Sequence, residues 1–402
     1  MSEFLLNEVC ELIVDCPHTT ANDEGKGFPL VRTPNIGKGR LVYDGMHRVC
    51  EDVYNKRNAR AIPQENDLIF AREATAGNVA LIQKGEKVCL GQRTVLIRPN
   101  QEKVNPAFLT YFLLAPKQQY NLLSTANGAT VAHVNLPTIR NLKIDLPELP
   151  TQHRIATILS RYDSLIENYQ KQIKLLEEAA QRLYKEWFID LHFPEHENTK
   201  IVDGVPEGWK KKTIADVCTN ISSGSTPSRS NKAYWENGTI KWVKTKELQD
   251  GWILDTEEYI SQEGYNSSST KMFPANTILM AIYASPTLGR LGILSIDCCC
   301  NQAALGLIAD ENIISWQWLF WKLYELRDEF NAIARGAGQQ NISGIVVKNK
   351  EIIIPDKGVI DGFTSVVSKM FEQQKSLSSQ LRLLTEARDR LLPKLMSGEI
   401  TV

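Results

Sequence analysis

Apolar residues recur at intervals of seven in two long stretches of the chain. In the first stretch one series falls at Ile155, Tyr162, Tyr169, Leu176 and Leu183, and a second follows four residues later at Leu159, Ile166, Ile173, Ala180 and Trp187. Two such series are typical of the seam of a coiled coil. The pattern predicts a helix of about 40 residues, or about 60 Å at 1.5 Å per residue.

The second stretch shows the same pattern with two polar interruptions. Its series fall at Phe363, Met370, Leu377, Leu384 and Leu391, and at Val367, Gln374, Leu381, Arg388 and Leu395. Polar seam residues such as Gln374 and Arg388 commonly fix register or partner orientation at some cost in stability. The alternative is that both simply face solvent.

The two stretches belong to an internal repeat. A shift of 208 positions carries Leu175-Leu176-x-Glu178-Ala179-x-x-Arg182-Leu183 onto Leu383-Leu384-x-Glu386-Ala387-x-x-Arg390-Leu391, with six identical residues. The offset drifts to 212 where Val31-Arg32-Thr33 matches Val243-Lys244-Thr245. Further matches pair Gly91-Gln92 with Asn301-Gln302 and Phe108-Leu109-x-Tyr111 with Trp318-Leu319-x-Trp321. We expect two globular regions of one fold whose loops differ.

Each globular region mixes short strands with helices, which indicates tandem domains of mixed α/β (α+β) class. Runs at 68–71, 94–97, 277–280 and 352–354 predict strands. Residues 108–114 and 316–324 predict short helices whose aromatic side chains are more typical of a core than of a base-stacking platform. The expected order is a domain at 1–150, a helix at 151–191, a linker at 192–206, a second domain at 207–358 and a second helix at 359–397.

The two predicted helices are separated by a whole globular domain. The simplest way to bury both seams is to pack the helices together, antiparallel and within one chain, which would relate the two copies by a pseudo-twofold axis. The pair would then act as a spacer. Two similar domains held at a fixed separation suit DNA half-sites about one turn, roughly 34 Å, apart.

The composition is that of a soluble globular protein, with 43% hydrophobic and 23% charged residues. No apolar run approaches the roughly 20 residues that span a bilayer. The acidic start, Met1-Ser2-Glu3-Phe4, lacks the features of a secretory signal. We therefore expect a cytoplasmic protein.

The eight cysteines form no C-x-x-C pair, and neighbours in the run at 298–300 should alternate faces on a strand. Buried free thiols are expected rather than disulfides or a zinc site. His192 and His196 have the spacing of helical metal ligands, but they flank Pro194, which does not fit one regular helix. No metal is expected there.

The formal net charge is −1, which argues against strong autonomous binding to DNA, because nonspecific affinity comes from lysine and arginine displacing counterions. A DNA reader of this charge should need help from partners. Residues 26–60 carry eight basic and three acidic residues. This local excess fits a DNA-binding face, but many solvated faces look the same.

Motifs of common catalytic sites are missing. No segment matches the phosphate cradle G-x-x-x-x-G-K-[ST], and none matches the N/D-P-P-Y/F loop of amino-methyltransferases. Glu24-Gly25-Lys26 has the tail of a nuclease E-x-K element but no Pro-Asp before it. With no G-x-S-x-G elbow and no plausible cysteine–histidine pair, we expect neither catalysis nor a cofactor.

Several motifs in fixed order resemble a known family. They are Glu207-Gly208-Trp209, Ile214-Ala215-Asp216-Val217, Ser223-Gly224-Ser225-Thr226-Pro227, Ile240-Lys241-Trp242-Val243-Lys244-Thr245 and Asn301-Gln302-Ala303, together with Pro147 and Gln152 before the first heptad stretch. Over essentially the whole chain the sequence is similar to the specificity subunits of type I restriction-modification systems. The first copy departs from the pattern, with Asp15-Cys16-Pro17-His18-Thr19 in place of Gly224-Ser225-Thr226-Pro227.

The resemblance implies a role without catalysis. Each globular copy would be a target recognition domain that reads one half of a split, asymmetric double-stranded DNA site. The helices would set the spacing and dock the modification (adenine methyltransferase) subunits, expected to be two, and the restriction subunits. Partner subunits would then supply much of the phosphate contact, which fits the near-zero charge.

Residues that contact bases are sought in matched loops of the two copies. Arg and Lys suit guanine edges, whereas Asn and Gln suit adenine. Candidates in the first copy are Arg32, Thr33, Asn35, Lys38, Arg40, Arg72, Thr75, Asn127, His133 and Asn135. Candidates in the second are Lys244, Thr245, Lys246, Tyr283, Ser285, Gln339, Gln340 and Asn341. Any of them could instead be a solvated loop residue, and His133 could be a structural histidine.

Two other classes of function compete with this interpretation. One is a coiled-coil assembly adaptor whose domains bind proteins rather than DNA. The other is a modification enzyme in its own right, against which the missing cofactor and catalytic loops argue.

Overall fold

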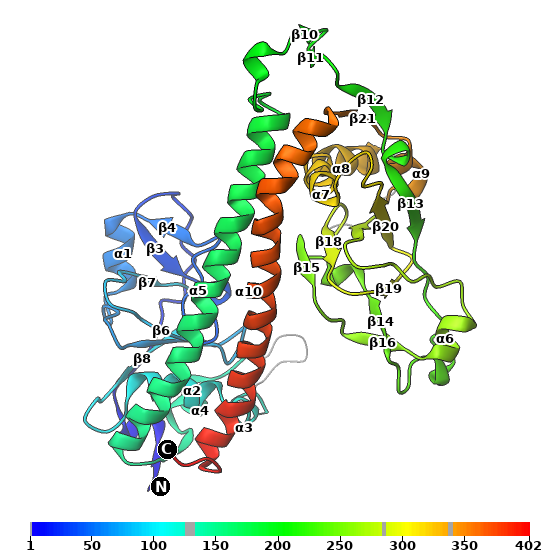
Figure 1. The fold of residues 1–402 in the computed structure, drawn as a ribbon. Coiled ribbons are helices and arrows are strands. Elements are labelled where there is room, and N and C mark those ends of the chain that lie inside the picture. The colour runs from blue at the N-terminus through cyan, green and yellow to red at the C-terminus, as the bar shows by residue number, and fades with distance from the viewer. Residues whose placement is uncertain (1, 125–132, 284–286, 337–340) are drawn as a thin grey trace. The chain divides into compact units, whose positions relative to one another are not determined.

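The computed structural model describes residues 2–124, 133–283, 287–336 and 341–402. The chain divides into two compact units: unit 1 comprises Met1–Glu167 and Leu383–Val402, and unit 2 comprises Asn168–Arg382. The long helices α5 (Leu149–Phe188) and α10 (Lys357–Ser397) each contribute one part to each unit (Figure 1). Each unit thus contains one globular region and two helix segments.

Unit 1 is built on two small sheets and one short ladder. Its strands are β1 (Ser2–Leu5), β2 (Cys10–Asp15), β3 (Phe28–Val31), β4 (His47–Val49), β5 (Leu68–Ala71), β6 (Val79–Leu81), β7 (Cys89–Leu90), β8 (Thr94–Pro99) and β9 (Lys143–Leu146). The larger sheet has the antiparallel order β2-β8-β5-β6. In the smaller sheet β3 lies between β4, antiparallel, and β7, parallel. The ladder pairs β1 with β9.

Unit 2 repeats this topology with one strand added. Apart from a two-stranded hairpin described below, its strands are β12 (Lys210–Thr213), β13 (Cys218–Ser223), β14 (Ile240–Val243), β15 (Gly251–Ile253), β16 (Glu258–Ile260), β17 (Ile278–Ala281), β18 (Leu291–Leu294), β19 (Cys299–Cys300), β20 (Ala304–Ala309) and β21 (Glu351–Ile354). The larger sheet has the order β13-β20-β17-β18-β15, the smaller β16-β14-β19, and β12 pairs with β21. The predicted internal repeat is therefore confirmed strand by strand, and all four predicted strands are present, with bounds that agree within two residues.

Short helices cover the sheets at matching places. Unit 1 has α1 (Glu51–Arg57), α2 (Pro106–Leu114), α3 (Pro116–Leu123) and α4 (Leu136–Arg140), and unit 2 has α6 (Gln262–Asn266), α7 (Trp316–Glu325), α8 (Arg327–Gly336) and α9 (Gly344–Lys348). The predicted helices are α2 and α7. Side chains of Asn105 and Ser315 cap them by accepting backbone N–H bonds at 2.9 and 3.2 Å. Phe108 and Trp318 are buried, as expected for core aromatics.

Single-turn 3₁₀ helices complete the units. They are η1 (Leu6–Glu8), η2 (Thr33–Asn35), η3 (His196–Asn198), η4 (Ala215–Val217), η5 (Lys232–Tyr234) and η6 (Thr245–Glu247). Of these, η2 and η6 occupy the same place in the repeat, each directly after the central strand of its smaller sheet.

The two long helices pack against each other in both units. In unit 1, Ile155 and Leu159 near the start of α5 share a core with Leu395 near the end of α10. In unit 2, the Tyr184 ring near the end of α5 lies 6.1 Å from the Phe363 ring near the start of α10. The helices therefore run antiparallel, as predicted.

The predicted seam is the buried face of both helices. All of its residues are buried or half-buried, including the polar ones. Gln374 is 7% exposed, and the Arg388 guanidinium lies 2.9 Å from the Asp163 carboxylate. The alternative that these two residues face solvent is therefore wrong.

Cysteine placement follows the predicted strand pattern with one exception. Cys298 and Cys300 pack in one core and Cys299 in another, so successive side chains do alternate faces. All eight cysteines are free, and five are buried. The expectation of burial is wrong for Cys50, which is exposed because it precedes α1 at the surface, while Cys10 and Cys218 are half-buried.

The segment between α5 and β12 contains η3 and a small hairpin of β10 (Ile201–Val202) and β11 (Val205–Pro206). The rings of His192 and His196 lie 5.3 Å apart, and His196 Nδ1 contacts the Phe193 carbonyl oxygen at 2.8 Å. Within the described ranges no three potential ligands gather for a metal ion. None of the helices in those ranges is long and apolar enough to cross a membrane.

Candidate nucleic-acid interface

In unit 1 three strands of the larger sheet have an end on the same side, where their connecting loops come together. β2 and β5 end there, and β8, which lies between them in the opposite direction, begins there. Backbone hydrogen bonds extend the pairing beyond the strands, from Cys16 to Thr94 at 3.1 Å and from Arg72 to Arg93 at 3.0 Å. The loops on this side of the sheet are 15–20, 72–78, 91–94 and 133–135. We call this group of loops edge 1.

Arg72 is held from three sides at edge 1. Its guanidinium donates to the Asp15 carboxylate at 2.6 Å and the Val134 carbonyl at 2.9 Å, and contacts His133 Nε2 at 2.8 Å. His133 Nδ1 in turn lies 2.6 Å from a Glu73 carboxylate oxygen. Because Arg72 is only 7% exposed, these contacts favour a role in supporting the edge for both Arg72 and His133.

The loop at 32–45 is joined to edge 1. The Thr75 hydroxyl donates to the Thr33 carbonyl at 2.8 Å. Asn35 is 2% exposed, accepts a hydrogen bond from the Arg32 backbone at 3.2 Å and donates to the Val42 carbonyl at 3.1 Å. The structure thus brings Arg32, Thr33, Asn35 and Thr75 together, with the Asn35 side chain occupied inside the loop.

Lys38 and Arg40 lie on the far part of the same loop, beside α5. Arg40 Nε is 3.5 Å from the Glu167 carboxylate. Lys38 lines a cavity of about 260 Å³ together with Asp163 and Arg388. Both cations therefore stand next to the long helices rather than at edge 1.

Unit 2 has the equivalent edge, which we call edge 2. Gly224 donates to the Ala304 carbonyl at 3.2 Å, as Cys16 does to Thr94 in unit 1. Ile342 donates to the Ile282 carbonyl at 3.0 Å, the same bond that Val134 makes to Arg72. The buried arginine of edge 1 is thus replaced by a buried isoleucine.

Tyr283 and Asn341 stand at edge 2 where Glu73 and His133 stand at edge 1. The two residues form an isolated β-bridge, and both are exposed. In edge 1, Asn135 directly precedes α4 and its side chain makes no capping bond. The remaining candidates lie outside the described residues, namely Asn127, Ser285, Gln339 and Gln340.

Lys244, Thr245 and Lys246 lie together at η6, and acidic residues neutralise both lysines. Lys244 Nζ is 2.7 Å from Glu258 and 3.2 Å from Glu257, and Lys246 Nζ is 2.5 Å from Glu257. Hydrogen bonds to Glu258 and Glu257 raise the pKa of Lys244. A phosphate that approached either ammonium group would meet a carboxylate beside it, which reduces the attraction.

Sequence reasoning did not select Gln92 and Gln302, which occupy matching places on the two edges. The Thr20 hydroxyl donates to the Gln92 carboxamide at 3.2 Å, and Thr226 donates to Gln302 in the same way. Their match in the repeat was the signal that could have found them. Glutamine suits the adenine edge, so both are candidates for base contact.

A second repeated surface runs along the long helices. The identical residues of the repeat include a stripe of exposed and half-buried residues on each helix, because positions three or four apart share a helix face. Leu175 is 64% exposed on α5 and its counterpart Leu383 is 57% exposed on α10. The stripes are Leu175, Glu178, Ala179 and Arg182 on α5, and Leu383, Glu386, Ala387 and Arg390 on α10.

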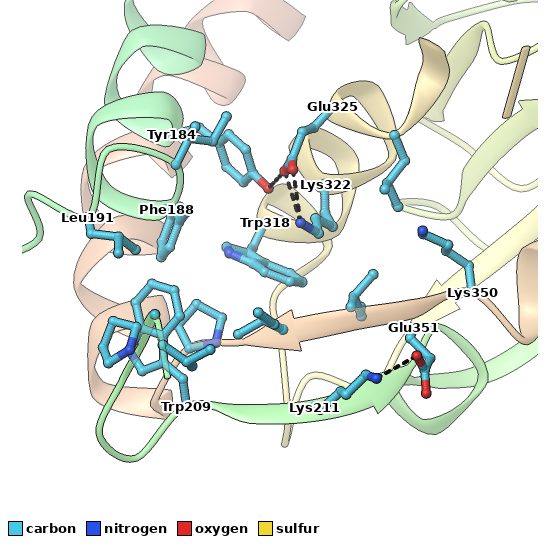
Figure 2. A pocket seen from close by; sticks show the side chains of 18 residues that line it. Tyr184, Phe188, Leu191, Trp209, Lys211, Trp318, Lys322, Glu325, Lys350 and Glu351 are labelled. Atoms are coloured by element: carbon cyan, nitrogen blue, oxygen red, sulfur yellow. Dashed lines mark hydrogen bonds and ion pairs between the residues drawn. The ribbon is translucent and has the colours of Figure 1, made fainter. Parts of the chain in front are cut away.

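Unit 2 also contains an aromatic cavity of about 550 Å³, shown in Figure 2. Two of its lysines pair with glutamates of the lining: Lys322 lies 3.0 Å from Glu325, which accepts from Tyr184 at 2.7 Å, and Lys211 lies 2.6 Å from Glu351. Burial raises the pKa of Tyr184, which stays protonated and donates. Among the described residues that line the cavity none is a cysteine, histidine, serine or threonine.

Comparison with known proteins places this architecture in a class. The fold is similar to that of the S subunit of a type I restriction-modification system from M. genitalium. That crystal structure matches 98% of this chain and 95% of its own, with a TM-score of 0.64 at 15% sequence identity, which shows the fold.

Sequence comparison identifies the family. The model of the type I restriction modification DNA specificity domain matches residues 1–178 and 206–377, so the chain belongs to this family. The MjaIX specificity subunit of Methanocaldococcus jannaschii is 26% identical over 94% of this chain and 88% of its own length. The HindI specificity subunit of Haemophilus influenzae is 26% identical over 76% of this chain and 80% of its own.

Proposed function

We propose that this chain is the non-catalytic DNA-reading subunit of a type I restriction-modification complex, with each unit reading one half of an asymmetric, two-part site. The main support for the proposal is that edges 1 and 2 share backbone hydrogen bonds but carry different side chains at matching positions. Glu73 and His133 on one edge correspond to Tyr283 and Asn341 on the other. Different polar groups on a common frame are what two different half-sites require.

The two long helices set the spacing of the half-sites in this proposal. They comprise 40 and 41 residues, which corresponds to about 60 Å of rod. Removing seven residues from α5 and the matching seven from α10 should shorten the spacer and keep both half-sites. An unchanged spacer in the methylated sites would reject this role.

The repeated stripe supports two methyltransferase subunits, because identical exposed residues on α5 and α10 offer the same contact twice. Leu175→Lys should remove one methyltransferase copy, Leu383→Lys the other, and the double variant both, as counted by native mass spectrometry. Leu165→Lys is the matched control, since Leu165 is 43% exposed on α5 but lies off the stripe. Loss of both copies from each single variant would contradict two independent docking places. Restriction subunits would join the same assembly.

The central test changes the two edges separately within the full complex. Gln92→Ala should alter only the half-site read by unit 1, and Gln302→Ala only the other half. Sequencing methylated adenines in cells that carry each variant reads out both halves at once. Equal changes in both halves, or none in either, would reject one reader per unit. Exchange of residues 1–150 with another such subunit should likewise change one half only.

The assembly adaptor predicts a different result in footprinting. An adaptor would protect no split sequence even with methyltransferase subunits present, whereas a reader protects two separated segments. The net charge of −1 predicts weak protection by this chain alone and strong protection with partners. A modification enzyme would bind S-adenosylmethionine by itself, and equilibrium dialysis of the purified chain tests that.

A further inference from the structure

The two units differ where a domain helix meets the long helices. In unit 1 the contact is polar and joins Tyr111 on α2, Asp163 on α5 and Arg388 on α10. The Tyr111 hydroxyl donates to Asp163 at 2.6 Å, and the Arg388 guanidinium donates to the other oxygen of the same carboxylate at 2.9 Å. Tyr111 is buried, and the other two side chains are 13% and 20% exposed.

The matching positions of unit 2 are apolar. The repeat shift of 208 carries Asp163 onto Phe371 and Ala180 onto Arg388, and the shift of 210 carries Tyr111 onto Trp321. Trp321, Phe371 and Ala180 are buried in one core, with the two rings 6.4 Å apart. A charged contact in unit 1 and an apolar contact in unit 2 thus occupy equivalent positions of the repeat.

The polar contact depends on all of its members. Burial and the neighbouring Asp163 carboxylate raise the pKa of Tyr111, so the phenol keeps its proton and donates. Burial alone would lower the pKa of Arg388, but hydrogen bonds to Asp163 and Asp389 raise it, so the guanidinium stays charged. A half-buried carboxylate without its guanidinium, or the reverse, is strongly unfavourable.

Because the helices pair antiparallel, the difference between the polar and the apolar contact favours pairing of α5 with α10 over pairing of either helix with its own copy. In the native pair the positions of the facing residues Asp163 and Arg388 add up to 551. The same sum in an antiparallel pair puts Ala180 opposite Phe371, and both residues lie in one core. If α5 paired with a second α5 in the equivalent register, Asp163 would face Ala180 of the other copy. If α10 paired with a second α10, Arg388 would face Phe371. Each like pair therefore leaves charges without partners, and only the mixed pair satisfies both contacts.

We propose that Asp163 and Arg388 make α5 select α10 and reject a second copy of itself. A polar seam position that decides between partners is a known use of such residues in coiled coils. The two heptad stretches resemble each other, so without the Asp163–Arg388 pair each helix could pair with a second copy of itself. Every assembly then holds one globular region of each kind. The consequence that the DNA site is asymmetric rests on the proposed function, whereas the pairing preference does not.

The test measures which partners the two fragments 1–198 and 199–402 bind after the folded chain has been cut. A protease site placed between Asn198 and Thr199 of the full chain is cut after folding, and exchange is driven by urea just below the unfolding midpoint. Native mass spectrometry then counts mixed and like pairs. For the wild type we expect mixed pairs in about tenfold excess over like pairs. Random pairing, with mixed pairs about half of the total, would overturn the proposal.

Variants separate selection from simple stability. Arg388→Ala copies Ala180 and should bring the distribution close to random, because two mixed pairs then contain the same set of contacts as one like pair of each kind. Asp163→Phe combined with Arg388→Ala makes both contacts apolar, removes the unpaired carboxylate and should also pair at random. Asp389→Ala is the control, since it removes a neighbour of Arg388 but keeps the contact with Asp163, and it should pair like the wild type. A wild-type preference in Arg388→Ala would overturn the proposal.

Discussion

Arg388 on α10 lies 2.9 Å from the Asp163 carboxylate on α5, and this pair joins the long helices within unit 1. Asp163→Asn and Arg388→Met should each destabilise the protein by roughly 1 to 3 kcal/mol, because each leaves a partly buried partner unsatisfied. The double variant should lose less than the sum of the two. Urea unfolding of the four proteins measures this.

A surface pair provides the control for this cycle. Arg390 lies 2.5 Å from Glu386 on the same helix, but its side chain is 78% exposed. Arg390→Met should change the free energy of unfolding by less than about 0.5 kcal/mol. Strict additivity of the Asp163 and Arg388 substitutions would show that the two side chains do not interact.

The heptad pattern predicted the long helices because periodicity records which side chains a helix buries. It could not decide whether Arg388 was buried, since its partner Asp163 lies 225 residues away in sequence. The repeat likewise predicted that the loops at Arg32 and Lys244 are equivalent, and η2 and η6 confirm it.

The candidate site was harder to predict for a physical reason. Residue type alone does not show whether a side chain is already occupied by a neighbour. Arg72 suits guanine by type, yet its donors bind Asp15 and Val134, and Lys244 is neutralised by glutamates. These contacts depend on loops that meet only in the folded chain.

Thiol chemistry should single out Cys50. It is exposed, whereas burial raises the pKa of Cys298 and Cys299 to about 12. At pH 8 one thiol per chain should react quickly with a disulfide reagent, and the buried thiols only after unfolding, because the thiolate is the reactive form. Cys50→Ser should abolish the fast phase. A fast phase of several thiols would contradict the buried cores.

Glu257 should weaken DNA binding by unit 2, because its carboxylate lies 2.5 Å from Lys246 Nζ and offsets the positive charge of that group. Hydrogen bonds from Lys246 and Lys244 lower the pKa of Glu257, so it is charged at neutral pH. In the complex with methyltransferase subunits, Glu257→Gln should raise affinity at low salt and steepen the slope of log K against log salt by about 1. Exposed Glu263 gives the control, Glu263→Gln, and equal slopes for both variants would place Lys246 away from DNA.

Asp255 should make unit 2 sensitive to acid. Its carboxylate lies 2.7 Å from Lys241 and 3.0 Å from Arg382, and it accepts from the Tyr259 hydroxyl at 2.6 Å. Burial opposes ionisation, but the hydrogen bonds from Lys241 and Tyr259 outweigh it and lower the pKa of Asp255 from 3.8 to about 2. The ionised form is therefore favoured more in the folded than in the unfolded chain.

A lowered pKa in the folded state fixes the sign of the effect. The stabilisation from Asp255 is fully present above the unfolded pKa of 3.8 and is lost as the pH falls through the folded value of about 2. Between pH 6 and pH 2 the unfolding free energy of the wild type should therefore fall more steeply than that of Asp255→Asn, and the two curves should converge near pH 2. Urea titrations at each pH measure both curves, and parallel curves would mean that Asp255 titrates alike in the folded and unfolded chains.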